Sequence, residues 1–325
     1  MKAKRSDLNL NRVIQNLLRG LSYTEIADEE ARHFDGATVG RGLIAGIARD
    51  LKNGSLTPSA AGINSGLSTY VYGVEQDNGG MPLFIGHPVL EEDAAIVISD
   101  IHIPKTRYDI VDSVNKSAVY YGAKTLIIAG DLFDFGSQAR FKRKVRPTPT
   151  SEDFRISRDM MAFFLEKFKS VKFIPGNHDD WFLENQEGNL TVTDLARLSV
   201  NPEDFNYVEF YAYDRMTLIS SGIEWVIPHQ SDSSVYSLKV AEQLSTKFHA
   251  NVVVPHQHNT ALGYDRYNRY VLADIGGLHD RNLMDYVSLK TSVAAIYDNG
   301  YAAIIDGAIE LIVPDDRHMV WRRLN

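Results

Sequence analysis

The sequence predicts an α/β protein: a two-sheet β-sandwich flanked by helices and preceded by a small all-helical domain. Two observations support this prediction. Through the middle of the chain, short apolar runs rich in β-branched residues alternate with segments of helical periodicity. The N-terminal part instead carries three consecutive helix-like patterns. We therefore expect a helical domain over 1–52, a linker leading into the main domain over 53–92, and the main domain over 93–325.

The composition is that of an ordinary globular chain. Hydrophobic residues make up 44% of the 325 residues and charged residues 23%, which excludes a mainly disordered chain. No apolar run approaches the ~18 to 20 residues of a membrane helix, and the basic N-terminus has no secretory cleavage site. The chain has no cysteine, which fits a cytoplasmic protein and leaves His, Asp, Glu and Asn to hold any metal.

Three short helices are predicted in the N-terminal domain. The segment 8–19 places its apolar residues on one helical face, and Gly20 ends it. Ser22 and Glu25 have the spacing of a capping box at the start of the second helix. The third helix is predicted within 35–52.

The second and third of these helices resemble a helix-turn-helix module. In SYTEIADEEARHFDGATVGRGL (22–43), an Ile-Ala pair opens the first helix and a Thr-Val pair opens the recognition helix. Recognition helices present their N-terminal side chains to base edges, so Thr38 and Arg41 are the candidate DNA or RNA contacts. Residues 1–56 hold nine basic and seven acidic residues, whereas the whole chain carries −8, which also favours an anionic partner for this domain. The alternative is a helical cap for docking or dimerisation, and no pattern specifies the oligomeric state.

The main domain begins with alternating strands and helices. Between 93 and 180, three strand-like runs that end in polar residues alternate with two segments of helical periodicity. The runs cover 93–100, 123–131 and 171–180, and the helical segments cover 108–122 and 157–170. Four later strand-like runs follow at shorter intervals and predict a second sheet: 224–232, 250–259, 269–277 and 301–313.

Residues that can bind a metal follow several of these apolar runs. D-I-H follows the first run at 100–102, G-D-L-F-D the second at 130–134, and G-N-H-D the third at 176–179. Two later runs end in His229 and in H-Q-H at 256–258. In layered α/β sheets, functional groups gather at the carboxyl ends of strands. Carboxylate, amide and imidazole groups suit Mn, Fe, Zn or similar ions rather than thiol-loving metals.

These five blocks, in this order, resemble the pattern of the calcineurin-like metallophosphoesterase superfamily: D-x-H, G-D-x-x-D, G-N-H-D/E, a lone His, and G-H-x-H. The resemblance extends from about 95 to 280. It implies the metallophosphoesterase fold and two divalent metal ions, with manganese expected and iron, zinc, nickel or magnesium as alternatives. The sequence is most similar to phosphoesterases of bacteriophage and bacterial genomes, which implies the cytoplasm of a bacterial or phage-infected cell.

The resemblance also implies a role for each ligand of a two-metal site. The implied ligands are Asp100, His102 and His258 for one ion, Asn177, His229 and His256 for the other, and Asp131 as the bridge between them. Two ions about 3.5–4 Å apart can clamp a phosphate ester and hold a hydroxide for in-line attack.

The resemblance implies catalytic roles for two further residues. His178 would be the general acid that protonates the leaving oxygen, because an imidazole pKa lies near neutral pH. Asp134 would orient His178 through a carboxylate–imidazole hydrogen bond. Asp179 is a candidate for a supporting residue behind the ligands. We assign the remaining histidines to core or surface by default, among them His87, His249, His279 and His318.

Three positions depart from the family pattern. Pro255 replaces the glycine of the last block, and Gln230 follows the lone histidine where glycine is usual. Phe135 stands where protein phosphatases of the superfamily carry an arginine that grips phosphate, which disfavours that activity. Basic residues follow shortly afterwards, and they form either a solvated face or phosphate and nucleic-acid contacts: Arg140, Lys142, Arg143 and Lys144.

Together these features predict a metal-dependent hydrolase of phosphate esters. The helix-turn-helix-like segment and the basic run favour phosphodiester hydrolysis in nucleic acid or nucleotides. One alternative is a phosphomonoesterase acting on small molecules or phosphoproteins. Another is a DNA-binding regulator whose phosphoesterase domain senses a ligand, although the intact ligand set and His178 argue against it.

Overall fold

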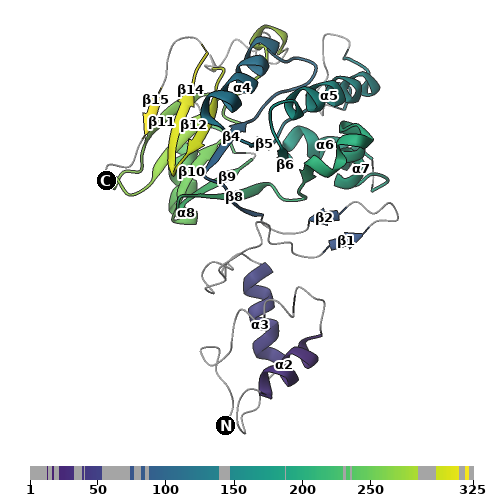
Figure 1. The fold of residues 1–325 in the computed structure, drawn as a ribbon, viewed down its shortest axis with the longest axis vertical. Helices are drawn as coiled ribbons and strands as arrows, with labels where there is room; N and C mark the ends of the chain where they lie inside the picture. Colours follow the sequence, from purple (N-terminus) through teal and green to yellow (C-terminus); the bar gives the residue numbers. More distant parts are fainter. Residues whose placement is uncertain are drawn as a thin grey trace.

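Two packed β-sheets with helices on their outer faces form the main domain, as the sequence predicts (Figure 1). The computed structural model describes residues 13, 17, 22–32, 39, 41–52, 74–76, 82–84, 88–138, 147–186, 188–229, 232–234, 236–284, 298–314 and 319–321. None of the helices in these ranges has the length and hydropathy that a bilayer crossing requires.

The first sheet contains the three strands predicted between 93 and 180. These strands are neighbours and run parallel, so their carboxyl ends meet at one edge of the sheet. The order across the sheet is β15 (Met319–Trp321), β14 (Ala308–Ile312), β13 (Tyr301–Ile305), β4 (Ala94–Ile98), β5 (Thr125–Ala129), β6 (Ser170–Ile174) and β7 (Val208–Phe210).

The second sheet contains three of the four later runs, whereas the run 301–313 forms the hairpin of β13 and β14 in the first sheet. Its order is β11 (Thr260–Tyr264), β12 (Val271–Ile275), β10 (Asn251–Val254), β9 (Ile223–Pro228), β8 (Arg215–Ser220) and β3 (Val89–Glu91). Strand β3 lies within the segment 53–92 that the sequence assigns to the linker, and it pairs in parallel with β8. The boundaries of the domains stay predictions.

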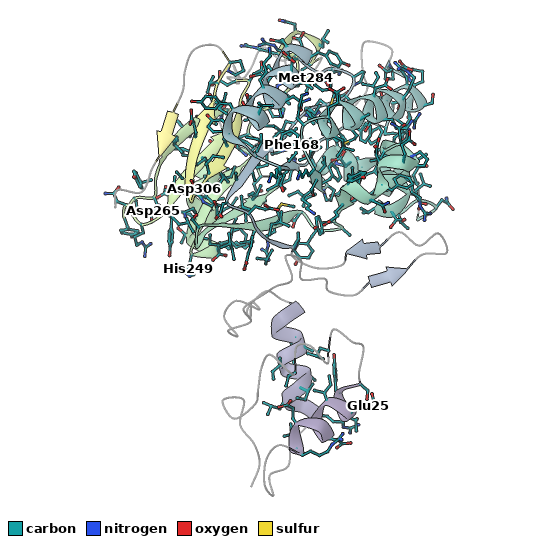
Figure 2. All side chains as sticks on the ribbon, in the orientation of Figure 1. Glu25, Phe168, His249, Asp265, Met284 and Asp306 are labelled. Atoms are coloured by element: carbon teal, nitrogen blue, oxygen red, sulfur yellow. The ribbon has the colours of Figure 1, made fainter. Side chains whose placement is uncertain are left out.

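Helices cover both outer faces of the two-sheet core. They are α4 (Tyr108–Tyr121), α5 (Thr150–Leu165), α6 (Asn177–Asn185) and α7 (Val192–Ser199) against the first sheet, and α8 (Lys239–Phe248) against the second. Short 3₁₀ helices occur at η3 (Pro202–Tyr207) and η4 (Arg281–Leu283). Neighbouring residues of β4 face opposite sides of the sheet, which explains the layering. Ile96 packs in the same core cluster as Phe168 and the helices, whereas Val97 packs in the cluster between the two sheets. Figure 2 shows Phe168 within the main domain.

The N-terminal helices that the structure describes are α2 (Tyr23–Ala31) and α3 (Arg41–Lys52), which pack against each other. The capping box is confirmed, since the backbone N–H of Glu25 donates to Ser22 Oγ over 3.3 Å and the Ser22 N–H donates to Glu25 Oε2 over 2.7 Å. Ile26, Ile44 and Ile47 are fully buried. A two-stranded antiparallel sheet follows, formed by β1 (Val74–Gln76) and β2 (Pro82–Phe84).

Packing between the sheets gives a stability prediction. Ile127 of β5 is fully buried between them, so Ile127→Ala should lower the free energy of unfolding by about 2–5 kcal/mol in urea titrations. Val119→Ala on α4 removes an apolar side chain that is 69% exposed, and it should change that free energy by less than about 0.5 kcal/mol. Equal effects of the two substitutions would contradict a tightly packed interface between the sheets.

Candidate metal centre

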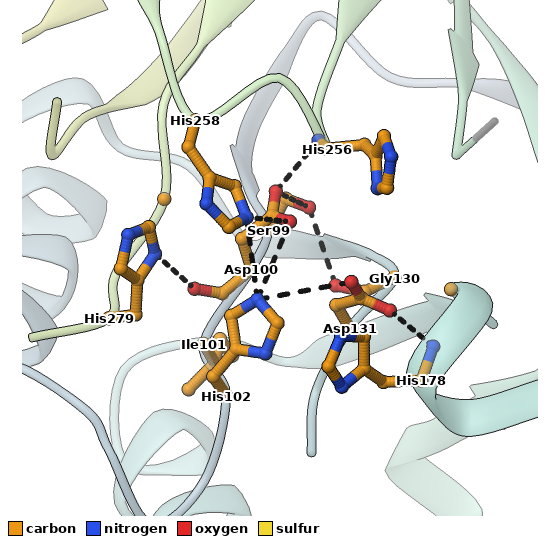
Figure 3. Close-up of polar contacts among 12 residues, drawn as sticks. Ser99, Asp100, Ile101, His102, Gly130, Asp131, His178, His256, His258 and His279 are labelled. Carbon is orange, nitrogen blue, oxygen red and sulfur yellow. Dashed lines mark hydrogen bonds and ion pairs between the residues drawn. The ribbon is translucent and has the colours of Figure 1, made fainter. Parts of the chain in front are cut away.

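The candidate ligands come from loops that follow five strands of the two sheets. Asp100 and His102 follow β4, Asp131 follows β5, Asn177 opens α6 after β6, His229 follows β9, and His256 and His258 follow β10. Although they are up to 158 positions apart in the chain, Asp100, His102, Asp131, His256 and His258 lie together where the strands end (Figure 3), and His229 joins this group. Asn177 lies between Gly176 and His178, and His178 donates its backbone N–H to Asp131.

Five of the seven candidate ligands have left-handed backbone conformations. Their φ angles are 50° at Asp100, 51° at His102, 50° at Asp131, 67° at His256 and 53° at His258. Residues other than glycine rarely adopt positive φ, and they persist there only where the surroundings fix them. The contacts around these residues therefore decide whether the site can form.

Asp100 is fully buried, and each of its carboxylate oxygens has a partner. Oδ1 accepts from His258 Nε2 over 2.9 Å, and Oδ2 accepts from Ser99 Oγ over 2.7 Å and from the backbone N–H of His256 over 2.9 Å. Burial raises the pKa of Asp100, but His258 and His229 outweigh burial and hold this pKa well below its usual range. The carboxylate is therefore ionised, and it faces the loop that carries His256 and His258.

Asp131 occupies the middle of the site. Its Oδ1 accepts the backbone N–H of His178 over 2.9 Å, and its Oδ2 lies 3.4 Å from His229 Nε2 and 3.9 Å from His102 Nε2. His229 donates its Nδ1–H to the carbonyl oxygen of Ala129 over 2.6 Å, which aims Nε2 at Asp131. Burial disfavours the charged ring of His229, but the carboxylates of Asp131 and Asp100 prevail and raise its pKa to about 10.

The donor set fits a divalent metal. A ring nitrogen or carboxylate oxygen from each of Asp100, Asp131, His229 and His256 lies within 4.8 Å of the others. Among the described residues, Asn177 Oδ1 and His256 Nδ1 are buried without a hydrogen-bond partner. Buried polar atoms are nearly always satisfied, so these two are available to bind an ion. Oxygen and imidazole donors together suit Mn, Fe, Zn or Ni.

Two glycines in the motifs are required by the close approach of the loops. A Cβ on Gly130, whose φ is 86°, would lie 2.3 Å from His229 Nδ1. A Cβ on Gly176 would lie 2.2 Å from Asp131 Oδ1 and 2.3 Å from its backbone nitrogen. Any larger residue at either position would displace a candidate ligand.

His178 and Asp134 are in contact, but not in the way that the sequence predicts. His178 Nδ1 donates to the backbone carbonyl oxygen of Asp134 over 2.8 Å, so the main chain makes the bond expected of the carboxylate. That carboxylate is buried, with Oδ2 3.1 Å from Lys105 Nζ and Oδ1 3.9 Å from His102 Nδ1. The main chain makes this bond because the turn after Asp131 directs the carbonyl group of Asp134 toward α6, which carries His178. The bond leaves His178 Nε2 as the nitrogen that can exchange a proton.

Asp179 lies behind the ligands and ties two loops together. Its Oδ2 accepts the backbone N–H of Gly176 over 2.8 Å and so caps α6, while its Oδ1 accepts the backbone N–H of Phe133 over 3.4 Å. Burial and the negative charge of Asp131 raise the pKa of Asp179 well above its usual value.

His279 also belongs to this region, and the sequence analysis did not assign it to the site. Its ring is fully buried, lies 4.2 Å from the ring of His258, and places Nδ1 3.3 Å from the carbonyl oxygen of Asp100. Burial lowers its pKa to about 3, so the ring is neutral at physiological pH. His279 lies outside the family blocks, but it follows an apolar run, as the candidate ligands do, and that position is the signal that could have found it.

The candidate nucleic-acid contacts are only partly described. Arg41 is the first residue of α3, is exposed, and lines a surface hollow with Tyr23 and Thr24 of α2. The other candidates lie outside the described residues: Thr38, Arg140, Lys142, Arg143 and Lys144.

Comparison with known proteins identifies the family. The sequence profile of the calcineurin-like phosphoesterases matches residues 95–288, a span that contains every candidate ligand. The chain belongs to this family. It is therefore a metal-dependent phosphoric ester hydrolase, and the two-sheet architecture with flanking helices is that of the metallophosphoesterases. The match begins after the N-terminal helices and leaves the helix-turn-helix-like segment untested, and a search of curated proteins finds no match.

Solved structures with a similar fold include several phosphoesterases. The phosphoesterase Yfce from E. coli is 13% identical, with a TM-score of 0.38 over 70% of this chain and 96% of that one. An archaeal phosphodiesterase is 11% identical, with a TM-score of 0.35 over 70% and 99%. A cold-active protein-tyrosine phosphatase of a Shewanella species is 10% identical, with a TM-score of 0.36 over 72% and 82%.

The glycine contacts generate a prediction about metal binding. Gly176→Ala should weaken Mn²⁺ binding at least about tenfold, because the new Cβ would push Asp131 out of place. Gly46→Ala on α3 is the control, since its Cβ would meet no atom of the described residues within 4 Å, and it should leave Mn²⁺ binding unchanged. Titration of each metal-free protein with Mn²⁺ in competition with a chromogenic chelator measures the effect. Unchanged affinity in Gly176→Ala would contradict the requirement for a glycine beside Asp131.

Proposed function

We propose that this protein hydrolyses phosphodiesters of nucleic acid or nucleotides at a two-metal site, with Mn²⁺ as the metal to test first. One ion would be held by Asp100, His102 and His258, the other by Asn177, His229 and His256, and Asp131 would contact both. When bound, such ions neutralise the charge of the phosphate and lower the pKa of the attacking water.

The protein's own residues would supply orientation and a proton. The backbone N–H of His178 holds Asp131 Oδ1 in place, so the ligand and the general acid are fixed to one another. The His178 ring is anchored through Nδ1 and buried to 7% exposure, and its Nε2 would give a proton to the leaving oxygen. The hydrogen bond to the main-chain carbonyl of Asp134 would therefore orient the His178 ring, as a carboxylate orients the imidazole in other acid–base pairs.

The observation that favours a diester is the position of Phe135. Its side chain is 1% exposed and stacks 4.4 Å from the ring of Phe133 and 4.5 Å from that of Phe182. A phosphomonoester carries one more negative charge than a diester, and the related protein phosphatases meet that charge with an arginine at this position. A buried phenylalanine supplies no cation there, so the single charge of a diester is the better match. A phosphomonoesterase remains the alternative, with a cation supplied from elsewhere.

The N-terminal helices favour nucleic acid as the source of the diester. Arg41 lies exposed in the first turn of α3, where a recognition helix contacts bases or phosphates. A docking or dimerisation role for these helices, or a regulator that only senses a ligand, are the competing functions, and the experiments below separate them.

Hydrolysis of two aryl phosphates tests the proposed function. With Mn²⁺, turnover of bis-p-nitrophenyl phosphate should exceed that of p-nitrophenyl phosphate, and chelation should abolish both. His178→Ala should lower kcat about 10²–10⁴-fold with Mn²⁺ affinity retained, whereas Asp131→Asn should lose both. His249→Ala, at the exposed end of α8, is the control and should change neither (Figure 2). Preference for the monoester would favour the phosphomonoesterase, and full activity of His178→Ala would refute its role as general acid.

DNA binding at different salt concentrations tests the N-terminal helices. Arg41→Ala should weaken duplex DNA binding and reduce the slope of log K against log salt by about 0.9, the contribution of one phosphate contact. Arg49→Ala is the matched control, because Arg49 is exposed near the other end of the same helix and should have no effect. Equal losses in both variants, or no DNA binding by the unmodified protein, would instead indicate a docking or dimerisation role.

A further inference from the structure

His279 is a fully buried histidine that the family pattern does not account for. Its ring centroid lies 4.2 Å from that of His258 and 5.5 Å from that of His102, and a nitrogen from each of the three rings lies within 4.8 Å of the others. Figure 3 shows His279 beside His258, with its Nδ1 directed at the main chain of Asp100. The residue therefore lies against all three of the residues proposed to hold one ion, Asp100, His102 and His258.

The contact with Asp100 involves the strained part of the backbone. The carbonyl oxygen of Asp100 accepts the backbone N–H of Leu278 over 3.0 Å and lies 3.3 Å from His279 Nδ1. A carbonyl oxygen can only accept, so the hydrogen of this contact is on Nδ1. Two donors thus converge on the carbonyl of a residue whose φ is 50°.

The loop that carries His279 is itself fixed from both sides. Asn299 Nδ2 donates to the carbonyl oxygens of Gly277 over 2.9 Å and of His279 over 2.8 Å. On the other side, the backbone N–H of Arg107 donates to the carbonyl of Leu278 over 2.8 Å. A Cβ on Gly277 would lie 2.7 Å from Asp100 Cβ, so the loop also packs directly against that ligand.

We propose that His279 is a positioning residue of the metal centre, which donates Nδ1–H to the Asp100 carbonyl and supports the ring of His258. Through this hydrogen bond His279 fixes the left-handed backbone of Asp100, and with it the direction of the carboxylate that meets His258 Nε2 over 2.9 Å. Outer residues that orient metal ligands by hydrogen bonds commonly change metal affinity 10–100-fold when replaced. The inference rests on the proposed two-metal site, to which it adds a residue.

Two near-isosteric substitutions isolate the hydrogen bond. Asparagine at 279 keeps an N–H donor close to the place of Nδ1, whereas leucine has a similar size and no donor. We expect His279→Leu to weaken Mn²⁺ binding about 10–100-fold and His279→Asn to remain within about threefold of the unmodified protein. Affinity is measured on the full-length, metal-free proteins by competition with a chromogenic chelator, after thermal unfolding has shown that each variant is folded. His249→Leu, at an exposed histidine, is the control and should not change affinity.

The outcomes separate this inference from the proposed function. Equal affinity of His279→Leu and the unmodified protein would overturn the positioning role while leaving the metal centre intact. Equal losses in the Asn and Leu variants would overturn it as well, because the ring itself would then be the essential group, as for a direct ligand. If His279→Leu does not fold, His279→Phe removes the donor while keeping a ring, and the same 10–100-fold loss is expected. An unmodified protein that binds neither Mn²⁺ nor Zn²⁺ would refute the metal centre and this inference together.

Discussion

The metal centre depends on backbone conformations that its residues would not adopt alone. Each left-handed non-glycine residue costs on the order of 1–3 kcal/mol, so the surrounding loops must offset this free energy at several ligands at once. They do so by bracing one another: the backbone N–H of Asp100 donates to the carbonyl of Gly130 over 3.1 Å, and that of His102 donates to the carbonyl of Asp131 over 3.1 Å. The two loops can hold each other because β4 and β5 are parallel neighbours whose carboxyl ends coincide.

The ionised carboxylates of the site are partly compensated by a neighbouring histidine. Asp100 and Asp131 are almost fully buried, and burial alone would favour their neutral forms. Buried carboxylates stay ionised only beside a compensating charge, which His229 supplies when protonated. His229 must give up that proton before Nε2 can donate a lone pair to an ion. The carboxylates of Asp100 and Asp131 attract a divalent metal, but they also raise the pKa of His229. Metal binding therefore competes with protonation of His229.

Most of the residues that the sequence singled out lie close together because a parallel sheet converts order along the chain into proximity in space. Asp100, Asp131 and His178 each follow an apolar run, and the ends of β4, β5 and β6 necessarily meet. The features that the sequence could not predict depend on contacts that leave no pattern in the neighbouring residues. Strand β3 has three residues, too few for a recognisable alternation, and the bond from His178 goes to a carbonyl group, which every residue possesses.

Phe135, the departure from the family pattern on which the proposed preference for a diester rests, is also part of the hydrophobic core. Phe135 is the middle ring of a stack with Phe133 and Phe182, and Phe154 of α5 packs edge-on against all three. This cluster joins the loop after β5 to α5 and α6, and α6 carries His178. An arginine at 135 would place a charge inside the cluster, where burial without a partner costs more than the aromatic packing it replaces. The absence of a guanidinium at this position is therefore tied to the packing around the helix that carries His178. A phosphate-binding cation for a more highly charged ester would have to come from a different part of the chain.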